Sequence, residues 1–331
     1  MVSEMPKVVW YFRKKRALGN FSIENSFHEL LPHFGEGDWE VEWREASWFS
    51  EGIWNRFRIA MEAKGLDADV IHITGDIHFA ALFLQKRMVV LTIHDNGHIE
   101  RSTGLKRWLM KKLWLNWPLK QCEKVVAVSE ATKRSILDLT SANRNQVEVI
   151  PTVVSSHFKP RKGAPNNPKP VLLHIGLAPN KNLSGHAAAI EGMDVLLRII
   201  GEPSTADRAM LESKGIDYEW KSRLSDAEMQ DAYATSDVLL FCSTLEGFGM
   251  PILEAKAVGV PVVTSAIAPM NEVGKGYAFL ADPDEPERIK KSLMEALESE
   301  TNVQCEVSLL ANSKAAAQRY KSLYSKIHSE I

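Results

Sequence analysis

Residues 246–254 read Glu-Gly-Phe-Gly-Met-Pro-Ile-Leu-Glu, so two carboxylates stand eight positions apart around a glycine turn and a proline. An apolar run at 237–242 precedes this segment, and another at 260–264 follows it after a helical pattern. Proline is favoured at the first position of a helix, so we expect Pro251 to open one and Glu254 to lie in its first turn. The segment predicts a strand, a glycine turn and a helix in that order, which is the repeating unit of a parallel α/β sheet.

The same segment has the chemistry of a ligand site. Glycines at 247 and 249 allow positive φ and a close approach of a ligand to the backbone. Met250 cannot cap the helix, so its first amides and the positive end of its dipole are available to a phosphate group. Glu246 and Glu254 can accept hydrogen bonds from hydroxyl groups, and a ligand that carries both phosphate and hydroxyls is a sugar nucleotide. The alternative is an ordinary helix after a strand, with two solvated glutamates.

Composition sets the broad class of protein. The chain has 331 residues, of which 45% are apolar and 25% charged, with a formal net charge of −2. These values are typical of a soluble protein of two domains, and they indicate no nucleic-acid partner. Cys122, Cys242 and Cys305 show no spacing of a metal site or disulfide. Because we find no secretory signal and no apolar run of about 20 residues, we expect a cytoplasmic protein.

Two series of α/β units are predicted along the chain. Apolar runs of strand length begin at residues 8, 70, 88, 124 and 147, and again at 171, 193, 238, 260 and 277. We expect a first domain at 1–158, a proline-rich linker at 159–170, a second domain at 171–305, and a C-terminal segment at 306–331 whose helix crosses back to the first domain. Two doubly wound parallel-sheet domains facing each other would line one cleft with the carboxyl ends of both sheets.

These motifs resemble a known family. Glu246 and Glu254 match the E-x7-E signature of the retaining nucleotide-sugar-dependent glycosyltransferases of family 4, also called glycosyl transferases group 1, which have the two-domain GT-B fold. Further similarity is found at 176–182, 225–234, 259–263, 271–274 and 282–283, and in the first half at 92–95, 128–130 and 149–151. The resemblance covers nearly the whole chain. It is strong after residue 165 and looser before residue 90.

The resemblance implies a role for each matched residue. Glu254 would bind the ribose of the donor, and Glu246 would contact the transferred sugar. The Lys181 ammonium can neutralise the departing diphosphate, which undergoes the largest charge change of the reaction. The implied catalytic residues are Glu246, His94 and Lys181, the implied donor-binding residues are Glu254, Gly247, Phe248, Gly249, Met250, Gly176, Arg223, Leu224 and Gly19, and the implied acceptor-binding residues are Asp95 and Asn20.

One departure from the family pattern concerns the donor phosphates. The family usually places an arginine directly after the glycine that is Gly176 here, and this chain has Leu177. The missing cation could be supplied by Arg223, by Lys221 or by the basic run at 13–16. Otherwise backbone amides alone would hold the diphosphate.

Metal binding is weighed at two places. His94, Asp95 and His98, with His72, could form a metal site, but a donor contact of His94 or a core histidine is preferred, because no fourth ligand and outer shell are defined. The Asp67-Ala-Asp69 pair precedes an apolar run instead of following one, and is expected to be a solvated turn. We therefore expect no metal and no cofactor other than the nucleotide-sugar co-substrate, a UDP- or GDP-sugar.

A basic and aromatic segment at 105–120 raises the question of a membrane. It holds five Lys and Arg residues, three tryptophans and no acid. That composition is typical of a helix on an anionic membrane surface, although a packed helix with snorkelling lysines explains it as well. Contact would make the protein peripheral on the cytoplasmic face of the inner or plasma membrane.

The sequence therefore predicts a hexosyltransferase-type enzyme that moves a sugar from a nucleoside diphosphate to a glycan or lipid-linked acceptor, in the assembly of a cell-surface polysaccharide or glycolipid. Retention of the anomeric configuration follows from the resemblance alone. The alternatives are a nucleotide-sugar epimerase or hydrolase on the same fold, and a non-catalytic carbohydrate-binding protein.

Overall fold

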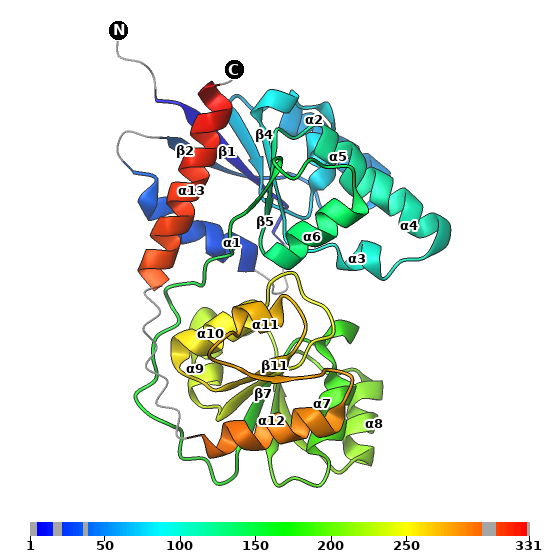
Figure 1. Cartoon of the computed structure of the whole chain (residues 1–331), viewed down its shortest axis with the longest axis vertical. Helices are drawn as coiled ribbons and strands as arrows, with labels where there is room; N and C mark the ends of the chain where they lie inside the picture. The colour runs from blue at the N-terminus through cyan, green and yellow to red at the C-terminus, as the bar shows by residue number, and fades with distance from the viewer. Residues whose placement is uncertain (1–4, 16–21, 36–38, 300–308, 330–331) are drawn as a thin grey trace. The chain divides into compact units, whose positions relative to one another are not determined.

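The computed structural model describes residues 5–15, 22–35, 39–299 and 309–329 and divides the chain into two compact units (Figure 1). The first unit comprises Met1–Val153 and Leu310–Ile331, and the second comprises Val154–Leu309. The stretch from 154 to 170 belongs to the second unit, where Phe158 packs in the core and the Arg161 amide donates to the Val258 carbonyl at 2.9 Å. Sequence composition places the end of the first domain five residues later, at 158.

The first unit has a parallel sheet of six strands in the order β2-β1-β3-β4-β5-β6. The strands are β1 (Lys7–Phe12), β2 (Glu40–Glu45), β3 (Val70–Ile73), β4 (Val89–Ile93), β5 (Lys124–Ala127) and β6 (Val147–Val149). The helical segments are α1 (Ser22–His28), η1 (Leu31–His33), α2 (Gly52–Lys64), η2 (His78–Phe83), η3 (Lys86–Met88), α3 (Gly97–Glu100), α4 (Gly104–Met110), η4 (Lys111–Asn116), α5 (Trp117–Lys120), α6 (Glu130–Leu139) and α13 (Leu309–Ser329).

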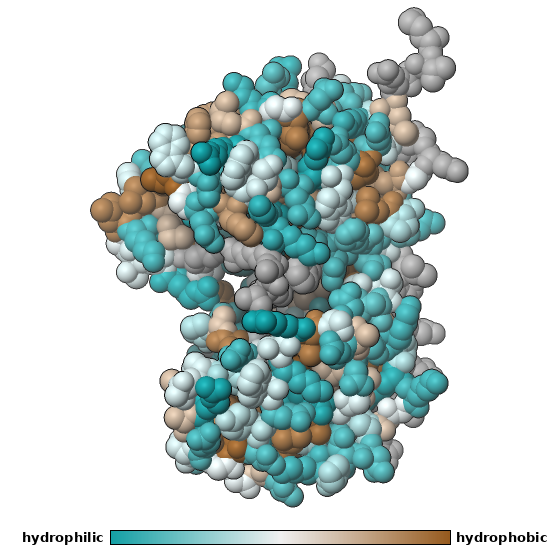
Figure 2. Space-filling model, turned by 180° about the vertical axis from the view of Figure 1, so that it is seen from behind, coloured by the Kyte–Doolittle hydropathy of each residue, from teal (hydrophilic) through white to brown (hydrophobic). Residues whose placement is uncertain are grey.

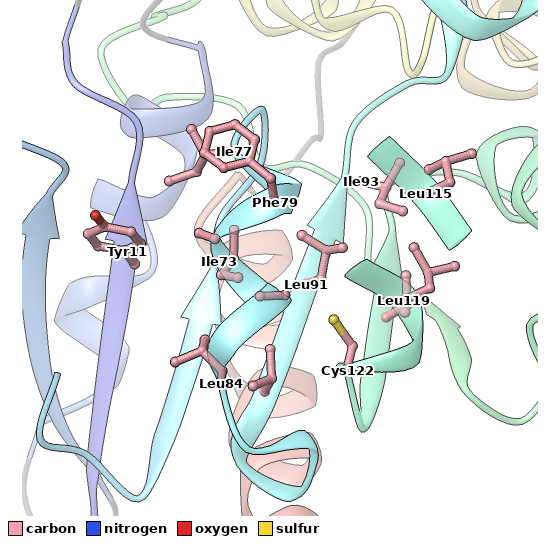
Figure 3. Close-up of a cluster of buried hydrophobic side chains, with 14 of the residues drawn as sticks. Tyr11, Ile73, Ile77, Phe79, Leu84, Leu91, Ile93, Leu115, Leu119 and Cys122 are labelled. Carbon is pink, nitrogen blue, oxygen red and sulfur yellow. The ribbon is translucent and has the colours of Figure 1, made fainter. Parts of the chain in front are cut away.

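The alternation of side chains along β1 sends apolar residues to both faces of this sheet. Val9 and Tyr11 enter a core formed with α2, η2, α5 and α6, part of which is seen in Figure 3. Val8, Trp10 and Phe12 enter a second core, formed with α1 and α13. Both faces are covered, which explains why the strands read as continuous apolar runs in the sequence.

The second unit repeats this plan with the strand order β12-β11-β10-β7-β8-β9, again all parallel. The strands are β7 (Val171–Ile175), β8 (Leu196–Ile200), β9 (Asp217–Lys221), β10 (Val238–Phe241), β11 (Val262–Ser265) and β12 (Phe279–Ala281). The helical segments are η5 (Pro179–Lys181), α7 (Leu183–Ile190), α8 (Thr205–Ser213), α9 (Asp226–Ala234), α10 (Met250–Val258), α11 (Met270–Val273) and α12 (Pro286–Glu298).

Strand order shows where a ligand fits in each sheet. Successive strands spread outward from β7 in one direction and from β10 in the other, so the order reverses between these two neighbours. The crevice outside the carboxyl ends of strands at such a reversal is the usual ligand site of a doubly wound sheet. The two predicted doubly wound sheets are confirmed. Within the described ranges, no helix is long and apolar enough to cross a membrane.

Candidate active site

Two loops in the second unit leave the neighbouring strands β7 and β10 and are fastened to each other. The Thr244 amide donates to the Asn180 carbonyl at 2.9 Å. The Asn180 side-chain amide donates in return to the Leu245 carbonyl at 2.8 Å. The loops at 176–182 and 243–249 therefore form one framework at the point where the strand order reverses.

Lys181 and Glu246 meet across this framework. The Lys181 ammonium lies 2.6 Å from Oε1 of Glu246, and both side chains are largely buried. The same ammonium lies 4.8 Å from the centre of the Phe241 ring. Gly176 has a φ of +85°, and a β-carbon there would lie 3.3 Å from the stem of Lys181. Glycine at 176 thus lets the lysine stem lie against the backbone.

The glycine turn opens α10 without a side-chain cap. Gly249 is the residue before the helix, with a φ of +98° that favours glycine, and Pro251 lies within the first two helical positions. The sequence analysis expects Glu254 in the first turn, and this is wrong. The helix begins at Met250, so Glu254 is its fifth residue. Side chains of a helix point back towards its N-terminus, so the Glu254 carboxylate still faces the turn.

Glu254 is held by a tyrosine that sequence reasoning missed. The Tyr233 hydroxyl, from α9, donates to Oε2 of Glu254 at 2.6 Å. Burial of the Glu254 carboxylate raises its pKa to about 7, against the opposing effects of the Tyr233 hydrogen bond and the Lys181 charge. Lys181 is thus close enough to influence both glutamates. The arrangement joins a cation, a paired carboxylate and a desolvated carboxylate beside a helix N-terminus.

Asn182 fixes the loop that carries Lys181. It has a left-handed φ of 57°, which asparagine tolerates better than most residues. Its Oδ1 accepts from the Gly185 amide at 3.2 Å and so caps α7. Its Nδ2 donates to the carbonyls of Cys242 and Pro283, at 3.1 and 2.7 Å. One side chain therefore joins three loops at the same edge of the sheet.

The other predicted donor residues are spread around this framework. Gly247 and Phe248 lie in the β10 loop between Glu246 and Gly249. Arg223 lies between β9 and α9 with a φ of 58°, and Leu224 packs against the core under α9 and α10. Leu177, at the position of the expected arginine, packs on Gly201 at the end of β8, where a β-carbon would meet its Cδ1 at 2.9 Å. An apolar contact thus replaces a cation there.

His94 and Asp95 lie in the first unit, at the end of β4. Nε2 of His94 donates to the Thr74 carbonyl at 2.8 Å, because a carbonyl can only accept. The His94 carbonyl in turn accepts from the Thr132 hydroxyl at 3.4 Å. Asp95 is exposed and its Oδ1 accepts from the Gly97 amide at 2.8 Å. His94 is therefore fixed in position, whereas Asp95 closes a turn.

The remaining predictions have different outcomes. Gly19 and Asn20 lie outside the described residues, as does the side chain of His98. His72 is fully buried and bonded to Tyr324 and Thr92, at 2.6 and 2.7 Å. Among the residues whose placement is described, no group of three or more potential ligands could hold a metal.

The first cation of the basic run at 13–16 is already engaged within the first unit. Arg13 forms ion pairs with Glu24 and Asp76. It is therefore a poor substitute for the expected phosphate-binding arginine.

Comparison with known proteins gives concordant matches. The sequence model of glycosyl transferases group 1 matches residues 155–317, and that of glycosyltransferase family 4 matches residues 38–158. The chain is 25% identical over 215 residues to the serotype-specific mannosyltransferase WbdA of Escherichia coli, covering 56% of this chain and 26% of that protein. It is 27% identical over 210 residues to the O-antigen chain mannosyltransferase B of Escherichia coli, covering 56% of this chain and 55% of that protein. The matches thus span about a quarter to a half of these relatives.

Solved structures show the same fold. HepE of Anabaena, in complex with UDP and glucose, superposes with a TM-score of 0.66 at 16% identity, covering 98% of both chains. WaaG, a glycosyltransferase involved in lipopolysaccharide biosynthesis, superposes with a TM-score of 0.64 at 15% identity, covering 98% of this chain and 99% of that chain. At these identities the likeness concerns the fold alone, which is the two-domain GT-B fold.

Proposed function

Because this chain belongs to the family 4 glycosyltransferases of group 1, we propose that it transfers a hexosyl unit from a nucleoside diphosphate sugar to a hydroxyl of a glycan or lipid-linked acceptor. The observation that carries this proposal is the Lys181–Glu246 pair beside the uncapped start of α10. Cations and helix amides at a departing diphosphate stabilise the charge that develops there. A carboxylate at 246 would support positive charge on the sugar ring.

The proposed reaction retains the anomeric configuration. The bond from C1 of the sugar to the diphosphate oxygen breaks, and the acceptor oxygen bonds to C1 on the same face. The acceptor proton passes to the departing nucleoside diphosphate. Lys181 would neutralise that group, and the Glu254 carboxylate, with one oxygen bonded by Tyr233, would take the ribose hydroxyls with the other. No metal or organic cofactor takes part in this proposal.

A mannosyl donor is the first candidate, because the similar curated proteins named above are mannosyltransferases. The test is a thermal-shift screen with UDP-, GDP- and dTDP-sugars. Ligand at a hundredfold excess over Kd stabilises a protein by about 2.7 kcal/mol, so the correct donor should stand out. Absence of a shift with every donor would count heavily against a nucleotide-sugar enzyme.

Product analysis separates the alternatives. Release of nucleotide that depends on an acceptor glycan indicates transfer, whereas release without acceptor indicates a hydrolase. Binding without any turnover indicates a carbohydrate-binding protein. The anomeric configuration of the product is read by NMR, and an inverted product contradicts the retaining mechanism.

We also propose that the first unit contacts an anionic membrane, in support of a lipid-linked acceptor. The helix formed by α4, η4 and α5 exposes Leu105, Trp108, Leu109, Leu113 and Trp117. Figure 2 shows apolar side chains gathered at the edge of the first unit where this helix lies. No Asp or Glu occurs from 101 to 122, while Lys106, Arg107, Lys111, Lys112 and Lys120 lie within it.

Helix α2 adds a second apolar stripe that the sequence analysis did not include. Ile53 and Trp54 are 84% and 77% exposed, and Phe57 and Met61 follow on the same side at helical spacing. Ile59, Ala60 and Ala63 face the core instead. Arg56 links the two helices, because its guanidinium lies 5.3 Å from the Trp114 ring centre of η4. Large exposed apolar patches with flanking cations are typical of an interfacial helix surface.

Flotation with vesicles tests this contact. Wild-type protein should float with vesicles containing anionic lipid, less so at high salt, and should not float with neutral vesicles. The double variants Ile53→Ser/Trp54→Ser and Leu105→Ser/Trp108→Ser should each reduce binding at least tenfold. Met294→Ser is the control, because Met294 is exposed on α12 of the second unit. Equal flotation of all four proteins, or of none, contradicts the proposal.

A further inference from the structure

Two buried histidines lie directly beneath the two loops of the candidate active site. His174 is on β7 and His186 is on α7, and both are at most 1% exposed. Nδ1 of one ring lies 2.8 Å from Nδ1 of the other. Nε2 of His186 lies 3.0 Å from the Cys242 amide, and Nε2 of His174 lies 2.7 Å from the Gly176 carbonyl. The pair therefore spans from the end of β10 to the end of β7.

The two backbone groups determine where the protons are. An amide N–H can only donate, so Nε2 of His186 accepts and its Nδ1 carries the proton. That proton is donated to Nδ1 of His174, whose own proton must then lie on Nε2 and is donated to the Gly176 carbonyl. The chain of three hydrogen bonds has one direction and requires both rings to be neutral. Burial favours this state by lowering the pKa of both rings.

We infer that His174 and His186 are positioning residues that hold Lys181 and Glu246 in register for sugar transfer, an inference that rests on the function proposed above. The chain of hydrogen bonds from the Cys242 amide through His186 and His174 to the Gly176 carbonyl is called the relay below. At one end, the relay fixes the carbonyl of Gly176, the glycine on which the Lys181 stem lies. At the other end, it fixes the amide of Cys242, four residues before Glu246 in the β10 loop. The Cys242 carbonyl is held separately by Asn182.

The relay differs from ordinary core packing because it joins the carboxyl ends of β7 and β10, where the two loops begin. β7 and β10 pair at Val238 with Leu172 and at Leu239 with Leu173. This pairing stops before His174, and the histidines continue the connection to the point where the loops diverge. Loss of the relay should therefore loosen the loops while the sheet stays intact.

Two substitutions each break one link. Asparagine places its amide nitrogen near the position of Nδ1, so His186→Asn keeps the donation to His174 and loses the Cys242 bond. Glutamine places its side-chain oxygen near the position of Nε2, so His186→Gln still accepts from the Cys242 amide and loses the hydrogen bond to His174. Ser236→Ala is the matched control, because Ser236 is fully buried at the other end of β10 and its hydroxyl donates to the Ala232 carbonyl at 2.7 Å.

The experiment compares kcat, the Kd for the free nucleotide and the acetylation rate of Lys181 by mass spectrometry. We expect both His186 variants to lower kcat at least tenfold and to speed Lys181 acetylation at least threefold. The Kd for the nucleoside diphosphate should rise as well, since Lys181 would also bind the diphosphate of the free nucleotide. The control should change none of these. Folded His186 variants with wild-type kcat and labelling would overturn the inference. Labelling needs no turnover, so an inactive wild type would contradict the proposed function and leave the relay test intact.

Discussion

At the scale of single residues, Glu246 and Glu254 differ although they share one sequence motif. Glu246 is neutralised by Lys181 at 2.6 Å, whereas the partner of Glu254 among the described residues is a tyrosine hydroxyl. The first suits electrostatic support of a reacting sugar, and the second suits acceptance of hydroxyl hydrogens. The two therefore should respond differently to the same Glu→Gln change.

Glu246→Gln should remove turnover and keep nucleotide binding. We expect kcat to fall about a hundredfold or more, the range seen when a preorganised charge at a transition state is removed. The nucleotide Kd, measured by calorimetry, should stay within threefold. Glu219→Gln is the control, since Glu219 pairs with Arg198 at 2.5 Å in the same unit. Unchanged turnover of Glu246→Gln would remove its assigned role.

Glu254→Gln should stabilise the free protein and weaken nucleotide binding. Because the pKa of Glu254 is raised to about 7, the folded state holds a proton that the unfolded state releases at lower pH. Its contribution to stability is present below pH 4.5 and lost as pH rises through 7, by about 3 kcal/mol at most. Denaturant unfolding at pH 8 should show a gain of about 1–3 kcal/mol for the variant. A loss of stability at pH 8 would contradict the argument.

At the scale of elements, the apolar runs predict ten strands, and each of the ten is present with ends shifted by up to three residues. The sequence analysis missed β2 and β9, each of which is one of the two edge strands of its sheet. Their sequences, EVEWRE and DYEWK, are rich in charge. Charge on an edge strand discourages pairing with other chains, so hydrophobicity does not reveal these two strands.

The site could be predicted in part for a similar reason. The Gly-x-Gly turn and the two glutamates are adjacent in sequence, so their chemistry is visible without a structure. Tyr233, His174 and His186 come from separate elements and have no local signature. Their roles depend on which strands lie side by side, and the order of strands in the sheet is not visible in the sequence.

Helix α13 shows how a distant element completes a core. Residues 316, 317, 320, 323, 324 and 327 are buried at helical spacing against the first sheet. Within that stripe, the Tyr324 hydroxyl accepts from the Trp10 indole at 3.1 Å and lies 2.6 Å from Nδ1 of His72. The C-terminal helix is thus tied to strands near the beginning of the chain.

Tyr324→Phe should destabilise the first unit by about 2–3 kcal/mol, because two buried polar groups lose their partner. The measurement is denaturant unfolding, with hydrogen exchange to localise the loss to the first unit. Tyr218→Phe is the control, since the Tyr218 hydroxyl donates to Glu212 at 3.3 Å in an exposed bond. Equal effects of the two changes would mean that the buried bonds contribute no more than a surface one.

At the scale of the whole molecule, both units contain buried neutral histidines, and these should make stability depend on acid. Burial lowers the pKa of His72 to about 3 in the first unit and that of His174 to about 4 in the second, and it also lowers that of His186. His94 adds to the effect on His72. For His174, Lys181 lowers the pKa, while Asp207 and the Gly176 carbonyl raise it. As pH falls, histidines in the unfolded chain take up protons before those buried in the folded protein. The contribution of these histidines to the free energy of unfolding is therefore full above pH 6.5 and is lost as pH falls below it.

The second unit should respond to acid more steeply in one variant than in the wild type. Each buried histidine contributes a slope of at most about 1.4 kcal/mol per pH unit between 6.5 and 4.5. The second unit holds two such groups, His174 and His186, and their effect is opposed over this range by the raised pKa of Glu254. Glu254→Gln removes the opposition, so the slope of the second unit should double to about 2.7 kcal/mol per pH unit. Hydrogen exchange at pH 6.5, 5.5 and 4.5 measures each unit separately. An unchanged slope in the variant would contradict the raised pKa of Glu254, and a slope near zero in the variant would show that the histidine pair is not kept neutral by the fold.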